Sequence, residues 1–134
     1  MKVKRSRRRR RVRVTADGRG VVSHAGTRLV ADVADESGLG ADLTAALASI
    51  ARRRRRHDPG DVLVDLALAL VDGGECVSDL KVLRDQPELF GDVASQPTAW
   101  RLLDAIDETL LAQLQSGRAA SRARVRAAGM APER

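Results

Sequence analysis

The sequence is poor in the residues on which disulfide bonds, thiolate metal sites and base stacking depend. Its 134 residues include one cysteine, one tryptophan, one phenylalanine and no tyrosine. A single cysteine forms neither an intramolecular disulfide nor a cysteine metal cluster, and it fits a reducing compartment. So few aromatic residues cannot build a platform on which unpaired bases stack. These shortages exclude a disulfide-stapled protein and, among nucleic acids, favour duplex DNA over single strands or RNA.

Long hydrophobic runs are also missing. The longest run, residues 62–71, contains Asp65 and is far shorter than the roughly 20 residues that cross a bilayer. The charged N-terminus is not followed by an apolar segment, so a cleaved secretion signal is not indicated. We therefore expect a cytoplasmic protein without a membrane partner.

Catalytic and metal-binding motifs are absent from the sequence. His24 and His57 are isolated, because no second ligand-type residue lies at ligand spacing on the same predicted face. Ser23 and His24 would point to opposite faces of a strand, a poor geometry for a nucleophile and its base. Asp61 and Asp65 lie one helical turn apart, and we expect them at a solvated surface rather than around an ion. The sequence thus predicts no catalytic residue, metal site, cofactor or small-molecule substrate.

Positive charge is what the sequence has in excess. The formal net charge is +6. Nine basic residues and no acid lie in residues 1–13, and five arginines follow one another at 52–56. Residues 61–116, in contrast, hold eleven acids and three bases. This imbalance favours a polyanionic partner, although GC-rich coding DNA would also raise the arginine content.

Two interpretations of the arginine run at 52–56 therefore stay open, namely contact with DNA phosphates or a solvated joint enriched by base composition. Lys81 and Arg84 lie on the exposed side of a predicted helix and are further candidates. If about six to eight clustered basic residues contact phosphates, the salt slope of binding is about −5 to −7. The candidate DNA contacts are Arg7, Arg8, Arg9, Arg10, Arg11, Arg52, Arg53, Arg54, Arg55, Arg56, Lys81 and Arg84.

The hydrophobic pattern predicts a mainly α-helical bundle. Alternating valines around Asp17 and Gly18 indicate a short N-terminal β-hairpin over residues 12–22. Helical periodicity follows, and the expected helices cover residues 27–36, 41–51, 62–71, 75–84 and 98–115. The first two helices, joined by a glycine-containing turn, have the outline of a helix-turn-helix pair.

Apolar spacing also predicts which side of each helix is buried. In the first helix, which Thr27 can cap, the inward face carries Leu29, Val30, Val33 and Ala34. The helix at 62–71 is apolar nearly all round, so we place it at the centre of the core. The helix at 98–115 is expected to be continuous, and its apolar stripe fades beyond residue 116.

Three stretches of the sequence resemble a known family. They are VVSHAGTRLVADVADESGL at 21–39, HDPGDVLVDLALALVDGGECVSDLKVLRDQPELFG at 57–91 and VASQPTAWRLLDAID at 93–107. They resemble the N-terminal region of insertion-sequence transposases with a DDE domain of the group 1 type, over about residues 12–126. The resemblance implies a helical module that helps to hold transposon ends. It also implies a later RNase H-like domain, whose three carboxylates bind divalent metal and cut and join DNA.

The resemblance also sets our expectation of domain organisation. We expect a basic disordered arm at 1–11, a transposase N-terminal helical domain with the leading hairpin at 12–116, and a basic tail at 117–134 that ends before the catalytic domain. No catalytic residue of the family can be assigned to a position of this chain, and a divalent metal would belong to the missing domain.

We therefore predict a truncated transposase region that binds duplex DNA, is not an enzyme, and can form an oligomer with a full-length transposase. Two alternatives stay open. One is a stand-alone helix-turn-helix regulator or an inhibitor of an intact transposase, and the other is a relic without function.

Overall fold

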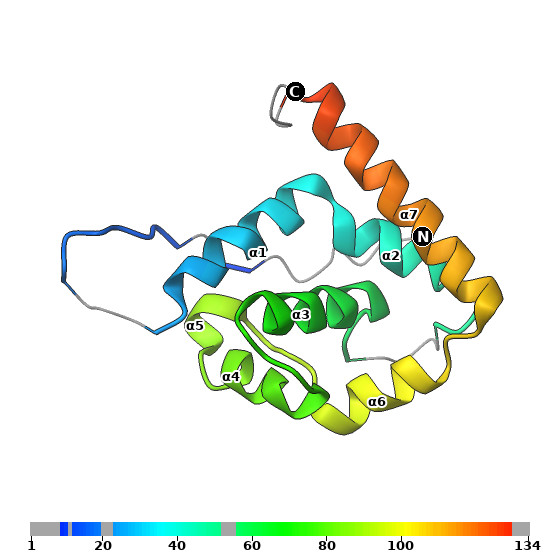
Figure 1. Cartoon of the computed structure of the whole chain (residues 1–134), viewed down its shortest axis with the longest axis horizontal. Coiled ribbons are helices and arrows are strands. Elements are labelled where there is room, and N and C mark those ends of the chain that lie inside the picture. Colours follow the sequence, from blue (N-terminus) through cyan, green and yellow to red (C-terminus); the bar gives the residue numbers. More distant parts are fainter. Residues whose placement is uncertain (1–8, 11, 20–22, 52–55, 130–134) are drawn as a thin grey trace.

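The computed structural model describes residues 9–10, 12–19, 23–51 and 56–129. Most of the predicted arm lies outside these residues, as do Arg7, Arg8, Arg11 and Arg52 to Arg55. The described residues are mainly helical and contain no strand (Figure 1). In chain order the helices are α1 (Ala25–Ser37), α2 (Leu39–Ala46), α3 (Pro59–Val71), the 3-10 turn η1 (Val77–Asp79), α4 (Leu80–Arg84), α5 (Pro87–Phe90), α6 (Gln96–Asp104) and α7 (Glu108–Ala127). No helix in this part of the chain is long and apolar enough to span a bilayer.

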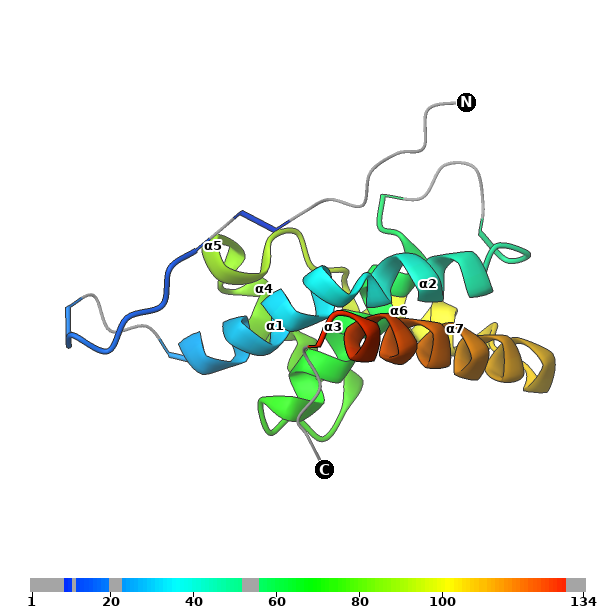
Figure 2. The same cartoon turned by 90° about the horizontal axis from the view of Figure 1, so that it is seen from above.

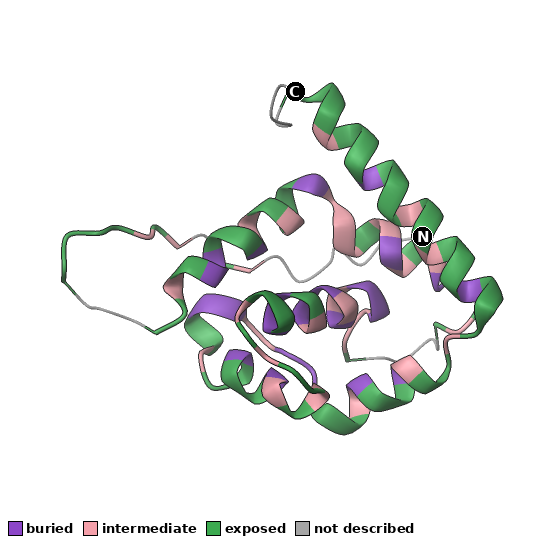
Figure 3. Ribbon diagram, in the orientation of Figure 1, coloured by how far each residue is buried: buried purple, intermediate pink, exposed green. Residues whose placement is uncertain are grey.

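Helix α3 forms the centre of the bundle, as its apolar sequence predicts. Pro59 opens it, where a missing N–H costs nothing, and Asp72 follows its last turn. Its side chains Val62, Val64 and Leu68 are buried. Buried positions gather along α3 and on the sides of the surrounding helices that face it (Figure 3). One apolar core therefore joins α1, α2 and α7 to the helices on the other side of α3.

Helices α2 and α3 approach closely because Gly60 has no side chain. A Cβ atom on Gly60 would clash with the carbonyl oxygen of Gly40 and the backbone nitrogen of Thr44. On the other side of α2, a Cβ atom on Gly117 of α7 would lie 3.1 Å from the carbonyl oxygen of Asp42. Helix α7 accordingly runs beside α2 (Figure 2). Helix α2 is therefore enclosed between α3 and α7.

This packing is the reason that the helix-turn-helix prediction is not supported. Gly38 does end α1 in the left-handed conformation, with φ 71°, as a glycine at this position predicts. Helix α2, however, ends at Ala46 instead of near residue 51. Its Asp42 accepts from Arg124 of α7 at 3.0 and 3.1 Å. Thr44 Oγ1 accepts the Gly60 N–H at 3.0 Å, so both polar side chains near the start of α2 are bound within the protein.

The predicted β-hairpin is wrong for the part of residues 12–22 that the structure describes. Residues 12–19 contain no strand, and the segment projects as a loop beside the start of α1 (Figure 1). Val12 packs against the helical core, whereas Val21 and Val22 lie outside the described residues. A two-stranded hairpin alone is marginally stable in water. Here the preceding backbone is bound to α1 instead, through the Arg10 carbonyl group.

The buried face of α1 also differs from the predicted one. Leu29 and Val33 are 53% and 62% exposed, whereas Thr27 and Arg28 are buried. The helix begins before Thr27, whose hydroxyl group donates to Asp72 at the end of α3 at 2.5 Å. This contact with α3 sets the rotation of α1 about its axis, so Leu29, Val30 and Val33 face outward, whereas Ala34 packs against the core as predicted.

On the other side of α3, the helix predicted over residues 75–84 corresponds to η1 and α4, whereas the short helix α5 was not predicted. Leu80 and Leu83 of α4 and Phe90 of α5 are buried. Ser95 begins α6 as an N-cap, and its Oγ accepts the Thr98 N–H at 3.4 Å. The predicted end at residue 84 holds, and α6 begins two residues before the predicted start at 98.

The single helix predicted for residues 98–115 is in fact two helices. Helix α6 ends at Asp104, and Asp107 starts α7 because its carboxylate accepts the Leu110 N–H at 2.8 Å. The corner between them directs α7 back along α2 (Figure 1). Helix α7 then continues to Ala127, well past the point where its apolar stripe was expected to fade.

Candidate nucleic-acid interface

Five candidate contacts from separate parts of the sequence meet at one cavity. Arg9 and Arg10 of the arm, Arg56 before α3, and Lys81 and Arg84 of α4 all line a cavity of about 860 Å³. Six aspartates line it too, namely Asp35, Asp58, Asp61, Asp65, Asp85 and Asp92. The local charge is therefore mixed, and the ion pairs decide which cations remain available to a ligand.

Arg9 is held inside this cavity by acids and is not free for DNA. Its guanidinium group donates to Asp35 Oδ1 and to Asp65 Oδ1, both at 2.6 Å, and to the Phe90 carbonyl oxygen at 3.3 Å. Its side chain is only 9% exposed. A predicted phosphate contact is thus a structural residue that fastens the arm to α1, α3 and α5.

The Asp65 carboxyl group is buried in α3 instead of lying at the solvated surface that we expected. Burial raises its pKa from the ordinary 3.8 to about 7 and outweighs the attraction and hydrogen bond of Arg9. Asp61 and Asp35 add a smaller upward effect on this pKa through like-charge repulsion. The hydrophobic pattern could not reveal this burial, because an aspartate within an apolar helix is ordinarily assigned to its wet side.

Arg28 is a second structural arginine, and the sequence analysis missed it. Its side chain is fully buried and donates to the Leu89 carbonyl oxygen, to the Arg10 carbonyl oxygen at 2.9 Å and to Asp32 at 2.6 Å. Arg28 therefore ties the arm and α5 to α1. Helical spacing assigns it to the polar face of α1, so no sequence signal marks it as buried.

Two of the remaining cations at the cavity have surface partners. Arg56 donates to both carboxylate oxygens of Asp92, at 3.0 and 3.2 Å. Lys81 pairs with Asp85 at 2.5 Å, one helical turn away. Exposed pairs of this kind are weak and are screened by salt, so a phosphate group can compete for either cation.

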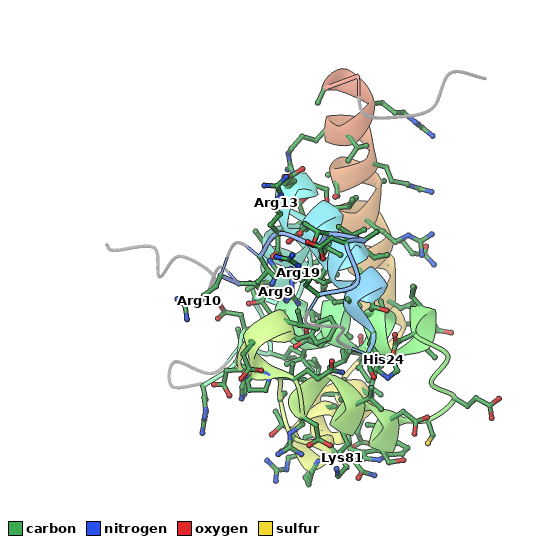
Figure 4. The ribbon with its side chains drawn as sticks, turned by 90° about the vertical axis from the view of Figure 1, so that its left-hand side faces the viewer. Arg9, Arg10, Arg13, Arg19, His24 and Lys81 are labelled. Atoms are coloured by element: carbon green, nitrogen blue, oxygen red, sulfur yellow. The ribbon has the colours of Figure 1, made fainter. Side chains whose placement is uncertain are left out.

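Arg10 and Arg84 form no ion pair within the described part of the chain. Both side chains are exposed. Arg10 points outward while its neighbour Arg9 lies among the helices (Figure 4). Of the predicted contacts that can be judged, these two are therefore the most available to a polyanion.

A second cavity, of about 580 Å³, adjoins the first and shares Arg56, His57 and Arg84 with it. It extends to the start of α6, where Thr98 and Arg101 line it. Arg101 was not among the predicted contacts, because it is a lone arginine in an acidic stretch. Only the fold places it on the same cavity as Arg84.

The described acids do not fit a divalent metal ion. Metal-assisted phosphoryl transfer needs carboxylates that converge on the ions, and no group of three or more His, Cys, Asp or Glu side chains in the described ranges is placed to hold one. Where Asp35 and Asp65 approach each other, the Arg9 guanidinium bonds to both. No chemical step through a metal is therefore derived for these residues.

His24 contributes to the fold and lies outside both cavities. It occupies the N-cap position of α1 with φ 62°, and its Nδ1 lies 2.5 Å from Asp72 Oδ2. The same carboxylate accepts the Thr27 hydroxyl group. This contact joins the start of α1 to the end of α3, and the His24 side chain makes no capping hydrogen bond to α1.

Comparison with known proteins identifies the family. The family model for the group 1 transposase DDE domain matches residues 4–130. No curated protein and no solved structure matches the chain. Because the matching model is that of an enzyme domain and extends over almost the whole chain, the expectation of a fragment that is not an enzyme is wrong. The match to nearly all of its residues shows that the chain belongs to the group 1 transposase DDE domain family.

Proposed function

We propose that this member of the transposase family acts in DNA transposition by binding duplex DNA at transposon ends. The proposed contact surface is the basic rim, which we define as Arg10, Arg56, Lys81 and Arg84. The family match does not favour a stand-alone regulator. What the rim adds to the family assignment is a location for the DNA backbone.

The observation that carries the proposal is the convergence of these four cations on one cavity. They come from three segments that are distant in sequence and line the same cavity of about 860 Å³. Arg10 and Arg84 have no ion-pair partner in the described part of the chain, and the partners of Arg56 and Lys81 lie at the surface. Guanidinium and ammonium groups so placed can neutralise backbone phosphates.

Binding at the basic rim is expected to need no divalent metal. The contacts are direct ones between cationic side chains and phosphates, and the described acids are not arranged around an ion. We therefore expect duplex binding to persist in the presence of EDTA and to need no added Mg²⁺.

The salt dependence of duplex binding tests the proposal. The variant Arg10→Gln/Lys81→Gln/Arg84→Gln removes three rim cations and leaves the Arg56–Asp92 pair in place. If each cation neutralises one phosphate, the slope of log affinity against log salt becomes shallower by about 3. Fluorescence anisotropy with a labelled duplex of about 30 base pairs, over a series of NaCl concentrations, measures this slope.

The matched control is Arg118→Gln/Arg122→Gln/Arg126→Gln, which removes three exposed charges from α7. This variant should keep a slope within about 1 of the wild-type value, because only general attraction is reduced. Absence of salt-dependent duplex binding by the wild-type chain would refute the proposal. Equal flattening by both triple variants would refute the assignment to the rim.

A further inference from the structure

Arg84 and Arg101 lie on the same cavity, and neither has an ion-pair partner in the described ranges. Arg84 comes from the end of α4 and Arg101 from α6, and both line the cavity of about 580 Å³. The only acid in this lining is Asp92, whose two carboxylate oxygens accept from Arg56. Because this acid already has a counter-charge, the cavity has an excess of positive charge.

The start of α6 adds hydrogen-bond donors to these two cations. Ser95 and Thr98 line the cavity, and their hydroxyl oxygens lie 3.0 Å apart. One hydroxyl hydrogen joins the two oxygens, so the other hydrogen is not used in that bond. The N-terminus of α6, which is the positive end of its helix dipole, lies at this lining and favours an anion. The lining thus combines two guanidinium groups, a hydroxyl pair and a helix start.

The chemistry of this lining selects a tetrahedral oxyanion. Guanidinium groups bind phosphate oxygens through parallel N–H donors. The lining has no phenylalanine, tyrosine or tryptophan on which a base could stack. The imidazole ring of His57 supplies an N–H group that can donate a further hydrogen bond. These features favour a phosphate group over a nucleobase or an apolar ligand.

We propose that Arg84 and Arg101, together with His57 and the Ser95–Thr98 hydroxyl pair, form a pocket that binds one phosphate group of the DNA backbone. This inference rests on the proposed duplex binding, and it extends the contact surface from the basic rim to α6. Arg84 lines both cavities, so it links the rim to this phosphate pocket. A bound duplex would then pass the start of α6.

Inorganic phosphate tests the pocket without relying on DNA. It is titrated into ¹⁵N-labelled wild-type protein at constant ionic strength, with chloride as the reference anion. Saturable shifts in the millimolar range are expected at the Thr98 and Ala99 amides and at the Arg84 and Arg101 side-chain NH groups. The variant Arg84→Gln/Arg101→Gln should lose them. Absence of saturable shifts at α6 in the wild-type protein would overturn the pocket.

A duplex titration then tests the source of the phosphate. Arg101→Gln alone is expected to weaken duplex binding about tenfold and to make the salt slope shallower by about 1. Arg122→Gln, which removes one exposed charge from α7, is the matched control and should change neither quantity by as much. Circular dichroism and the thermal unfolding midpoint verify that both variants fold.

The outcomes separate this inference from the function on which it rests. If the wild-type chain binds duplex and Arg101→Gln binds it equally well, the phosphate pocket is not part of the DNA contact and the inference is wrong. If phosphate shifts α6 but no duplex binds, the proposed function fails and the pocket is one for free phosphate. Losses in both experiments, with Arg122→Gln unaffected, support the backbone phosphate.

Discussion

The Asp65 carboxyl group lies where the N-terminal arm meets α1 and α3. The Arg9 guanidinium bonds to Asp65 and Asp35 at 2.6 Å each. Arg9, which was expected to contact DNA, is thus paired with acids inside the protein, while the adjacent Arg10 remains exposed. Two neighbouring residues of one basic run therefore have different roles, and only their surroundings distinguish them.

The raised pKa of Asp65 predicts a pH-dependent stability. Its pKa is 3.8 ordinarily and about 7 in the folded chain. Between these values the folded state holds a proton that the unfolded state releases, so the Asp65 contribution to the free energy of unfolding falls as pH rises from about 4 to 7. This contribution is fully present below pH 4 and lost above pH 7. Asp65→Asn removes this pH-dependent contribution, which changes the free energy of unfolding by a few kcal/mol between about pH 4 and 7.

Urea unfolding of wild-type and Asp65→Asn protein at pH 4.5, 6 and 7.5, followed by circular dichroism, measures the effect. The quantity of interest is the difference in unfolding free energy between the two proteins at each pH. We expect the stability of the variant relative to the wild type to increase as pH rises. Asp85→Asn removes an exposed carboxylate as a control and should not produce this trend. A pH-independent difference for Asp65→Asn would contradict the prediction.

At the scale of elements, the crossing of α2 and α3 depends on Gly60. A Cβ atom there would overlap backbone atoms of Gly40 and Thr44, and backbone cannot rotate away as a flexible side chain can. The Gly60 N–H also donates to Thr44 Oγ1 at 3.0 Å. The two helices must therefore separate to accept any other residue at this position.

Gly60→Ala is accordingly expected to destabilise the fold by at least about 2 kcal/mol. The matched control is Gly26→Ala in α1, where a Cβ atom would meet nothing within 4 Å. That substitution should be neutral or stabilising by up to about 1 kcal/mol, because alanine has the higher helix propensity. Urea midpoints of the two variants measure the effects, and equal midpoints would show that the crossing is not tight.

At the scale of the whole molecule, α7 returns along α2 and connects the last third of the chain to the first. Ser121 and Arg124 of α7 both donate to the Ser37 carbonyl oxygen, at 3.3 and 2.5 Å. The apolar core is a single cluster with members from α1 to α7. The described chain should therefore unfold as one unit.

Trp100, the only tryptophan, reports on this cooperativity from α6. Its fluorescence and the far-ultraviolet circular dichroism should have the same urea midpoint. Leu47 lies in the turn after α2 and is fully buried. Leu47→Ala should lower the free energy of unfolding by about 2–5 kcal/mol and should therefore lower both midpoints equally. A tryptophan transition that precedes the loss of helix would mean that α6 unfolds separately, contrary to the prediction.

The sequence by itself determined the helical class, the central place of α3 and the ends of several helices. These features depend on composition and on signals within one turn, such as Pro59, Ser95 and the turn at Gly38. The family resemblance was visible there too, although the inference from it that the chain is not an enzyme was wrong. The convergence of the cations on one cavity could not be predicted from the sequence. The charge of an arginine does not show which other residues the fold brings beside it.

Only the tertiary structure decided the rotation of α1, the burial of Arg28 and Asp65, and the placement of Arg84 and Arg101 on one cavity. Each depends on a contact between residues far apart in the chain. An amphipathic pattern gives the period of a helix, but the neighbouring helix sets which face is covered. For the same reason an arginine becomes a structural tie or an exposed cation according to whether the fold places a carboxylate beside it.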